Sequence, residues 1–417
     1  MNNHFLSNLI NVLIVKVLRI PDLLILMDSP WKIRAVELLY ASGAIYFLWR
    51  MKDVFGEGIA RYSVLILITC IPFLNYATQV RGYCLNVFLA AALMYCVLHA
   101  GRVRKIAAAI STFLLLYSMP SNIYMVAGMM IGLLILRRFF DILWVAIGIG
   151  LAVLAYLPLI PGIMADPQLT TEYHFYADIL TDTLPVVFHS FVSWRYLLII
   201  PVFMGLSVAM KTWRREIAFL ACVLIIPFLL AWLKGGYHYD RTFLVLLPAF
   251  CLLAALCLDN MKWPVKLCKW AFPTIALYCT VTMILCTLAY SEILKNDIIN
   301  GSPRKVSLLC NYWQAHYHPK TTLREFKSIR SNSVTFFKWK YDHAALTLYI
   351  RKYFKDIVTE NNDSLYVVSS EFVPQSNNGF TIERMNKCLD FHNIYLVRRT
   401  SAPDSINILQ WLSQIVK

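Results

Sequence analysis

The stretch Asn75-Tyr-Ala-Thr-Gln-Val-Arg-Gly-Tyr-Cys84 is a polar break between two apolar runs, residues 64–74 and 85–98. Its one charged residue is Arg81. A charge between two such runs lies either at a membrane surface or in a polar cavity within the membrane. The rest of the chain is therefore placed relative to this break.

Composition sets the class of protein. Hydrophobic residues make up 59% of the chain and the mean hydropathy is +0.58, more than a soluble domain can bury. The net charge of +15 comes from Lys and Arg between apolar runs, which is typical of cytoplasmic membrane loops and not of a nucleic-acid partner. The 11 Cys show no CxxC spacing, so no metal site is predicted. The sequence predicts an α-helical polytopic membrane protein.

The first segment, residues 1–32, is too polar to be a clear transmembrane helix. Its apolar residues recur at helical spacing: Leu9, Val12, Leu13, Val17 and Ile20. This pattern predicts an amphipathic helix that lies in the membrane interface.

Residues 33–290 contain about ten hydrophobic segments. Basic clusters follow alternate segments: residues 50–52, 102–105, 137–138, 211–215 and 262–269. By the positive-inside rule these clusters are cytoplasmic, so the Arg81 break and the loops 158–191 and 235–241 are external. Two short runs, 106–117 and 123–136, are separated by Ser118-Met-Pro-Ser-Asn122, and we expect a bent helical hairpin that faces protein.

In residues 291–417 the hydrophobic residues follow a different spacing. The runs 365–370 and 394–397 are typical of strands, while 344–357 and 406–415 have helical spacing. We expect a small α/β domain outside the membrane. Cys310 and Cys388 are its two cysteines, and they either form a disulfide or stay free.

Two arginines and one loop could carry chemistry on the external side. Arg81 and Arg241, each beside an apolar run, would suit a phosphate attached to a lipid. Alternatively, Arg81 snorkels to the interface and Arg241 pairs with Asp240 at a helix start. The external loop carries Asp166 and Glu172, which are either acid/base groups or ordinary solvated residues.

Three segments, taken in order, resemble the multi-pass glycosyltransferases of the C superfamily. They are Asn2-Asn-His-Phe-Leu6, Gln79-Val-Arg-Gly-Tyr83 and Tyr239-Asp-Arg-Thr-Phe-Leu-Val-Leu-Leu-Pro248. That superfamily contains the dolichyl-phosphate-mannose protein mannosyltransferases and the bacterial lipid-A aminoarabinose transferases. The resemblance implies that substrate is bound by His4, Arg81, Tyr83, His238, Asp240 and Arg241.

The chain also departs from the superfamily pattern. Phe5 replaces the usual Pro, and the family opens with a transmembrane helix and an external loop that bears the catalytic acid. Here the first residues resemble the segment that follows that loop. We expect an N-terminally truncated chain that lacks this base; in the competing interpretation Asp166 or Glu172 supplies it.

The resemblance implies a membrane glycosyltransferase that moves a sugar from a polyprenyl-phosphate donor to a glycan, lipid or protein acceptor on the external face. No further cofactor is implied. The alternatives are a transporter or flippase, which the break at residues 118–122 favours, and a catalytically dead truncated transferase. We expect a multi-pass protein of a bacterial inner membrane, with its C-terminal domain outside.

Overall fold

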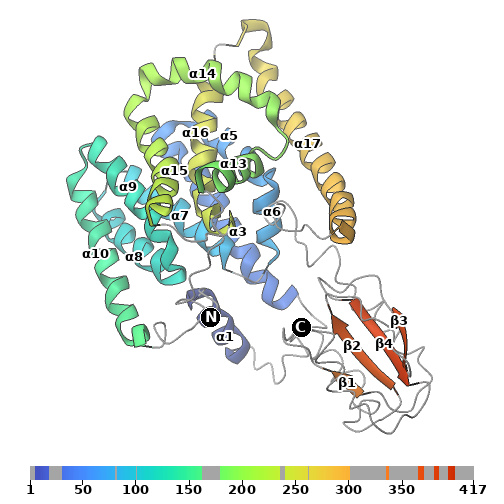
Figure 1. The fold of residues 1–417 in the computed structure, drawn as a ribbon. Helices are drawn as coiled ribbons and strands as arrows, with labels where there is room; N and C mark the ends of the chain where they lie inside the picture. Colours follow the sequence, from blue (N-terminus) through green and yellow to red (C-terminus); the bar gives the residue numbers. More distant parts are fainter. Residues whose placement is uncertain are drawn as a thin grey trace. The chain divides into compact units, whose positions relative to one another are not determined.

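The computed structural model describes residues 5–17, 31–79, 82–99, 101–161, 179–234, 240–261 and 263–300, together with four short strands (Figure 1). The chain divides into two compact units. One contains the helices as far as Glu292, and the other contains the strands. The predicted divisions at residues 32 and 290 remain predictions.

Helix α1, Phe5–Val17, forms where helical spacing predicts it. Its side chains Leu9, Val12, Leu13 and Val17 are exposed. The helix packs against α8, and the Phe5 ring meets the Tyr156 ring edge-on at 5.6 Å. The apolar face therefore points away from the protein, as expected for a helix whose partner is lipid.

Each predicted hydrophobic segment is helical. The helices are α3 (Trp31–Arg50), α5 (Glu57–Ile68), α6 (Ile71–Ala77), α7 (Tyr83–Leu98), α8 (Arg102–Ser118), α9 (Ile123–Ile135), α10 (Phe139–Tyr156), α14 (Ile199–Thr212), α15 (Arg214–Lys234), α16 (Leu247–Asn260) and α17 (Val265–Asn300). Shorter pieces join them: α4 (Lys52–Phe55), η1 (Pro120–Asn122), η2 (Leu157–Leu159), η3 (Ile179–Thr183), α13 (Leu184–Val192), η4 (Tyr196–Leu198) and η5 (Asp240–Leu246).

Fewer of these helices are long enough to cross a membrane than the hydrophobic segments suggest. Within the described residues four helices meet the length and hydropathy requirement, or six if each of two bent pairs is one span. Helix α7, with 16 residues, reaches only about 24 Å, against about 30 Å of bilayer core. The bent pairs are Glu57–Ile68 with Ile71–Ala77, at 66°, and Ile179–Val192 with Tyr196–Thr212, at 94°.

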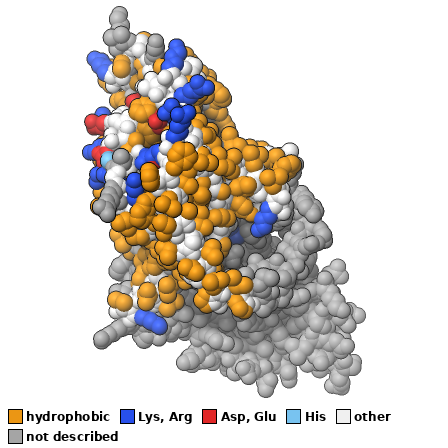
Figure 2. All heavy atoms as spheres, turned by 90° about the vertical axis from the view of Figure 1, so that its left-hand side faces the viewer, with side chains coloured by type: hydrophobic (Ala, Val, Ile, Leu, Met, Phe, Trp, Pro, Cys, Tyr) orange, Lys and Arg blue, Asp and Glu red, His pale blue; other side chains and the backbone are white. Residues whose placement is uncertain are grey.

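The outer surface of the helical unit is strongly apolar. Figure 2 shows a broad hydrophobic face with most of the Lys and Arg side chains gathered in its upper part. Along α10, exposed side chains include Phe140, Leu143, Leu151 and Leu154. Such a continuous apolar surface requires lipid or protein cover. The chain is a multi-span helical membrane protein.

Helix α7 forms the centre of the helical unit. Nearly all of its residues are buried, and it packs against α3 and α8 and against η5. The rings of Tyr40, Phe47, Phe88 and Tyr95 line its contact with α3, with centroids 5.7–6.3 Å apart. A helix that is apolar on all sides is expected to be internal.

The two runs around residues 118–122 form α8 and α9, joined by η1. Helix α8 packs against α7 and α10, whereas α9 packs against α15. The two helices thus face protein as predicted, but each has its own partners. Their polar connection is held beside η5, which it contacts.

The prediction of an external loop over residues 158–191 is wrong for its second half. Residues Ile179–Val192 are helical, and Val187, Ser190 and Phe191 are buried. The sequence Leu184-Pro-Val-Val-Phe-His-Ser-Phe-Val192 explains this, because Pro185 suits the first turn of a helix and the apolar residues pack inward. The Phe191 ring lies 5.5 Å from that of Phe250 on α16.

Arg195 joins the two helix breaks. Its side chain is 2% exposed and donates hydrogen bonds to Ile66 O (3.0 Å), Thr69 Oγ1 (2.9 Å), Phe191 O (2.6 Å) and Val192 O (2.8 Å). The last carbonyls of a helix lack partners within it, and here one guanidinium satisfies carbonyls of both α5 and α13. The bends are therefore fixed by polar contacts.

The second unit contains a four-stranded sheet with strand order β1-β2-β4-β3. Its strands are β1 (Thr335–Phe337), β2 (Leu365–Ser370), β3 (Phe380–Arg384) and β4 (Asn393–Arg399). Strand β1 runs parallel to β2, and the other pairs are antiparallel. Both predicted strand runs lie in this sheet. The predicted helices of the tail, with Cys310 and Cys388, lie outside the described residues.

Candidate functional site

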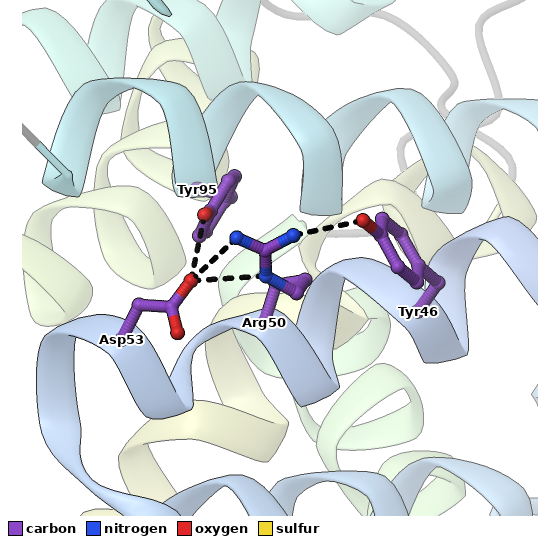
Figure 3. Close-up of polar contacts among 4 residues, drawn as sticks. All are labelled: Tyr46, Arg50, Asp53 and Tyr95. Carbon is purple, nitrogen blue, oxygen red and sulfur yellow. Dashed lines mark hydrogen bonds and ion pairs between the residues drawn. The ribbon is translucent and has the colours of Figure 1, made fainter. Parts of the chain in front are cut away.

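One end of the helical unit carries a network around Arg50 (Figure 3). Asp53 Oδ2 accepts hydrogen bonds from Arg50 Nε and from the Tyr95 hydroxyl, both at 2.9 Å, and pairs with Arg50 Nη2 at 2.8 Å. Arg50 Nη1 also donates to the Tyr46 hydroxyl at 2.9 Å. The hydrogen bond from Arg50, followed by that from Tyr95, lowers the pKa of the Asp53 carboxyl below its ordinary value.

The other basic clusters reach the same end. The Arg104 guanidinium lies 5.0 Å from the centroid of the Tyr95 ring. Arg138 donates to Leu98 O at 2.9 Å, at the end of α7, and pairs with Asp141. The Trp213 ring, between Lys211 and Arg215, packs 5.4 Å from the ring of Phe55. Four basic clusters that are far apart in the sequence therefore share one end of the unit.

The opposite end contains the first turn of α7, directly after the Arg81 break. Gly82 precedes the helix with a φ of 69°, a conformation that favours glycine and explains this residue in the Arg-Gly-Tyr segment. Tyr83 is buried, and its ring meets that of Tyr76 edge-on at 4.9 Å. No side chain of a described residue caps this helix start. The positive end of a helix dipole favours anions.

Glu37, on α3, faces this turn. The residue is 0% exposed, and neither carboxylate oxygen makes a well-formed hydrogen bond within the described residues. The Gly82 backbone amide lies beside this carboxyl group, as do the Tyr40 hydroxyl and the Cys84 thiol.

A second group of polar side chains lies on the other side of the turn. Asn86, 2% exposed, donates from Nδ2 to Met119 Sδ at 3.5 Å, beside η1. Asn122 donates from Nδ2 to Leu115 O at 2.9 Å. The Oδ1 atoms of both asparagines and the Oγ of Ser118 are buried and accept no hydrogen bond from the described residues. These three residues form what we call the polar centre: Asn86, Ser118 and Asn122.

The element η5 brings Asp240 and Arg241 to this end. It packs against both α7 and η1. The Phe243 ring stacks on that of Phe228 at 4.4 Å and fixes η5 against α15. Asp240 and Arg241 are half-buried. A short tight helix thus holds one acid and one guanidinium at the edge of the polar centre.

The structure describes three of the predicted site residues, Tyr83, Asp240 and Arg241. It places them on elements that pack against each other, α7 and η5. The other five lie outside the described residues: His4, Arg81, Asp166, Glu172 and His238. Whether the two arginines face one phosphate therefore remains a prediction. The described residues contain no group of His, Cys, Asp or Glu that could hold a metal ion.

Sequence reasoning missed both Glu37 and the polar centre. Glu37 was visible as an acid within an apolar run, and a charge there is a functional signal. Ser118 and Asn122 were noted only as a break between two helices. Asn86 gave no signal, because one polar residue in an apolar helix is consistent with many environments.

Comparison with known proteins supports the fold. No family model matches the chain, and no curated protein matches it. By structure, the chain is similar in fold to two solved structures of one membrane protein. This likeness concerns the fold alone, since sequence identity is low.

These two solved structures are of ArnT from Cupriavidus metallidurans. The crystal structure in the apo state matches with a TM-score of 0.54 and 11% identity, over 88% of this chain and 83% of that chain. The structure bound to undecaprenyl phosphate matches with a TM-score of 0.52 and 13% identity, over 88% and 84%. The expected resemblance of fold is therefore confirmed.

Proposed function

We propose that this protein is a glycosyltransferase that takes a sugar from a polyprenyl-phosphate carrier and passes it to an acceptor on the external face of the membrane. One observation carries the proposal: the helical unit is similar in fold to ArnT, and the elements that bear Tyr83 and Asp240-Arg241, α7 and η5, pack against each other. The likeness to a structure bound to undecaprenyl phosphate supports such a lipid as donor.

The proposed reaction requires cations that bind the phosphate and a base that accepts a proton. Arg241, with Arg81, binds the phosphate of the donor and neutralises the charge that develops on it as the bond to the sugar breaks. The positive end of the α7 helix dipole favours the same anion. A carboxylate removes the proton from the acceptor hydroxyl, whose oxygen then attacks the anomeric carbon; Asp166 and Glu172 are our candidates. Tyr83, His4, His238 and Asp240 line the bound donor.

The topology of the proposal follows from the two ends of the helical unit. The end that carries Arg50, Arg104, Arg138 and Trp213 is cytoplasmic, because it collects the basic clusters. The polar centre is then external. The protein lies in a bacterial inner membrane, and the unit with the four-stranded sheet is outside.

A transporter or flippase is the second candidate, because two helix pairs are broken by 66° and 94°. Broken helices form the substrate sites of many transporters. Here, however, Arg195 holds both breaks together by four hydrogen bonds, which favours a rigid frame over a moving gate.

The proposal is tested with the full chain in proteoliposomes. A panel of undecaprenyl-phosphate-linked radiolabelled sugars is added, and release of undecaprenyl phosphate together with transfer of label to membrane lipid, glycan or protein is measured. We expect turnover with at least one sugar and loss of about 10-fold or more with Arg241→Ala. The matched control is Arg61→Ala, which removes a surface arginine that is 54% exposed and paired with Glu57. Movement of the intact donor across the membrane without release of the carrier would favour the flippase.

A further inference from the structure

The basic end of the helical unit carries positive charge that its acids do not neutralise. Arg50 pairs with Asp53, and Arg138 pairs with Asp141. Three further cations belong to the same end, on α4 and on the first turn of α8, and none of them forms an ion pair with a described residue: Lys52, Arg104 and Lys105. An excess of positive charge therefore remains there.

Aromatic rings hold these three cations in place. Lys52 Nζ lies 5.1 Å from the centroid of the Trp49 ring, the Arg104 guanidinium 5.0 Å from that of Tyr95, and Lys105 Nζ 5.3 Å from that of Phe140. A ring attracts a cation but leaves its charge in place. The Nη1 atom of Arg104 is buried and donates to no acceptor among the described residues. The cations are thus positioned without being neutralised.

The start of α8 is an unfavourable place for such cations. The helix begins with Arg102-Val-Arg-Lys105, with no acid in its first turn and no side-chain cap from a described residue. The positive end of a helix dipole repels Lys and Arg. These residues therefore do not stabilise the start of the helix by themselves, whereas an anion bound beside them would.

An apolar surface runs on from this cationic group. Val103, Ile106 and Ile110 are exposed and recur at helical spacing, so they share one face of α8. Helix α10 packs beside α8 and adds the exposed ring of Phe140, over which Lys105 lies. Figure 2 shows a hydrophobic face of this kind, bordered by Lys and Arg side chains. A free phosphate would fit only the charged part, but a phospholipid with an anionic headgroup fits both parts.

We propose that Arg104 and Lys105 bind the phosphate headgroup of an anionic phospholipid, whose acyl chains cover Val103, Ile106 and Phe140. Basic groups between membrane helices on the cytoplasmic side are suited to such headgroups. The site lies at the opposite end of the helical unit from the first turn of α7. It is therefore separate from the proposed donor site, and the inference does not depend on transferase activity.

The test compares lipids that differ in headgroup charge. Thermal unfolding of the purified full chain in detergent is followed against increasing concentrations of phosphatidylglycerol, which is anionic, phosphatidylcholine, which is zwitterionic, and inorganic phosphate. We expect phosphatidylglycerol to raise the melting temperature at lower concentration and by more than the other two. The double variant Arg104→Gln with Lys105→Gln should lose at least about tenfold in affinity for phosphatidylglycerol. Lys105→Gln alone should lose part of it, and this variant is read if the double variant does not fold.

Lys211→Gln with Arg215→Gln is the matched control. It removes two exposed cations of another basic cluster at the same end, so it should keep the affinity of the parent for phosphatidylglycerol. If this control loses as much affinity as the double variant, the attraction is spread over the whole end, and the inference is wrong. Undiminished affinity in the Arg104 and Lys105 variants would also overturn it. So would an equal response of the parent to phosphatidylcholine or to inorganic phosphate.

Discussion

At Arg195 a guanidinium is buried inside a membrane protein and still satisfied, because it ends two helices at once. Its acceptors are Thr69 and the carbonyls of Ile66, Phe191 and Val192. The sequence gives no direct sign of this role, since Arg195 follows an apolar run as a loop residue would. Two of its partners, Ile66 and Thr69 at the end of α5, are more than a hundred residues away in the sequence, and only the fold brings them close.

Arg195→Leu should destabilise the protein strongly. The substitution leaves four buried acceptors without their donor, at roughly 1–3 kcal/mol for each. Arg195→Lys should rescue only part of this loss, because an ammonium cannot reproduce the planar fork. Melting temperature in detergent is the measurement, with Arg61→Ala as the surface control. Equal melting temperatures for Arg195→Leu and Arg61→Ala would contradict this role.

Asp53 offers a prediction about pH. Its pKa is lowered in the folded protein by Arg50 and then by Tyr95, so its ionised form stabilises the fold above the unfolded pKa of about 3.9. This contribution is lost as the pH falls through the lower folded value. Asp53→Asn should therefore melt below the parent at pH 7, and the two melting curves should converge in acid. A difference that stays constant down to the acid limit would show that the charge is not responsible.

At the scale of elements, the hydrophobic runs were enough to find the helices. They did not show which helices are long enough to span the membrane or which are buried among other helices. Helices α3, α7 and α9 were predicted as segments, yet none of them is both long and apolar enough by itself to count as a span. Burial of α7 on all sides comes from its neighbours. The buried segment Ile179–Val192 was taken for a loop because Asp, His and Tyr dominate the residues before it.

Close packing of α10 on α8 can be tested at two glycines of the same helix. A Cβ atom added at Gly148 would lie 2.5 Å from Ala109 O and 2.6 Å from Thr112 Cβ, whereas one at Gly150 would meet nothing within 4 Å. Gly148→Ala should push the helices apart and cost roughly 1–3 kcal/mol. Gly150→Ala should be neutral or slightly stabilising. Equal melting temperatures for the two variants would contradict this helix contact.

At the scale of the whole molecule, the spacing of the basic clusters predicted more of the arrangement of the helices than any single motif did. Residues 50–52, 102–105, 137–138 and 211–215 follow alternate helices, and contacts of Arg50, Arg104, Arg138 and Trp213 place them at one end. The polar centre at the other end could not be predicted, because its members come from α7, α8 and η1 and become neighbours only on folding.

The sidedness of the two ends makes a direct prediction. A single cysteine introduced at Arg215 should react with a membrane-impermeant thiol reagent only after the membrane is opened, because its cluster is cytoplasmic. A cysteine at Arg61 should behave in the same way, since α5 begins beside the Arg50 network. Labelling at position 215 in sealed cells would overturn the topology. The native cysteines are replaced or blocked first.

Binding of a polyprenyl phosphate at the end that holds α7 and η5 tests the central claim most directly. The shift in melting temperature of the full chain is measured with undecaprenyl phosphate and with undecaprenol, which lacks the phosphate. We expect stabilisation by the phosphate form alone, its loss in Arg241→Ala, and its retention in Arg61→Ala. Equal stabilisation by both lipids, or an undiminished response in Arg241→Ala, would contradict the claim that this end of the protein binds the lipid phosphate.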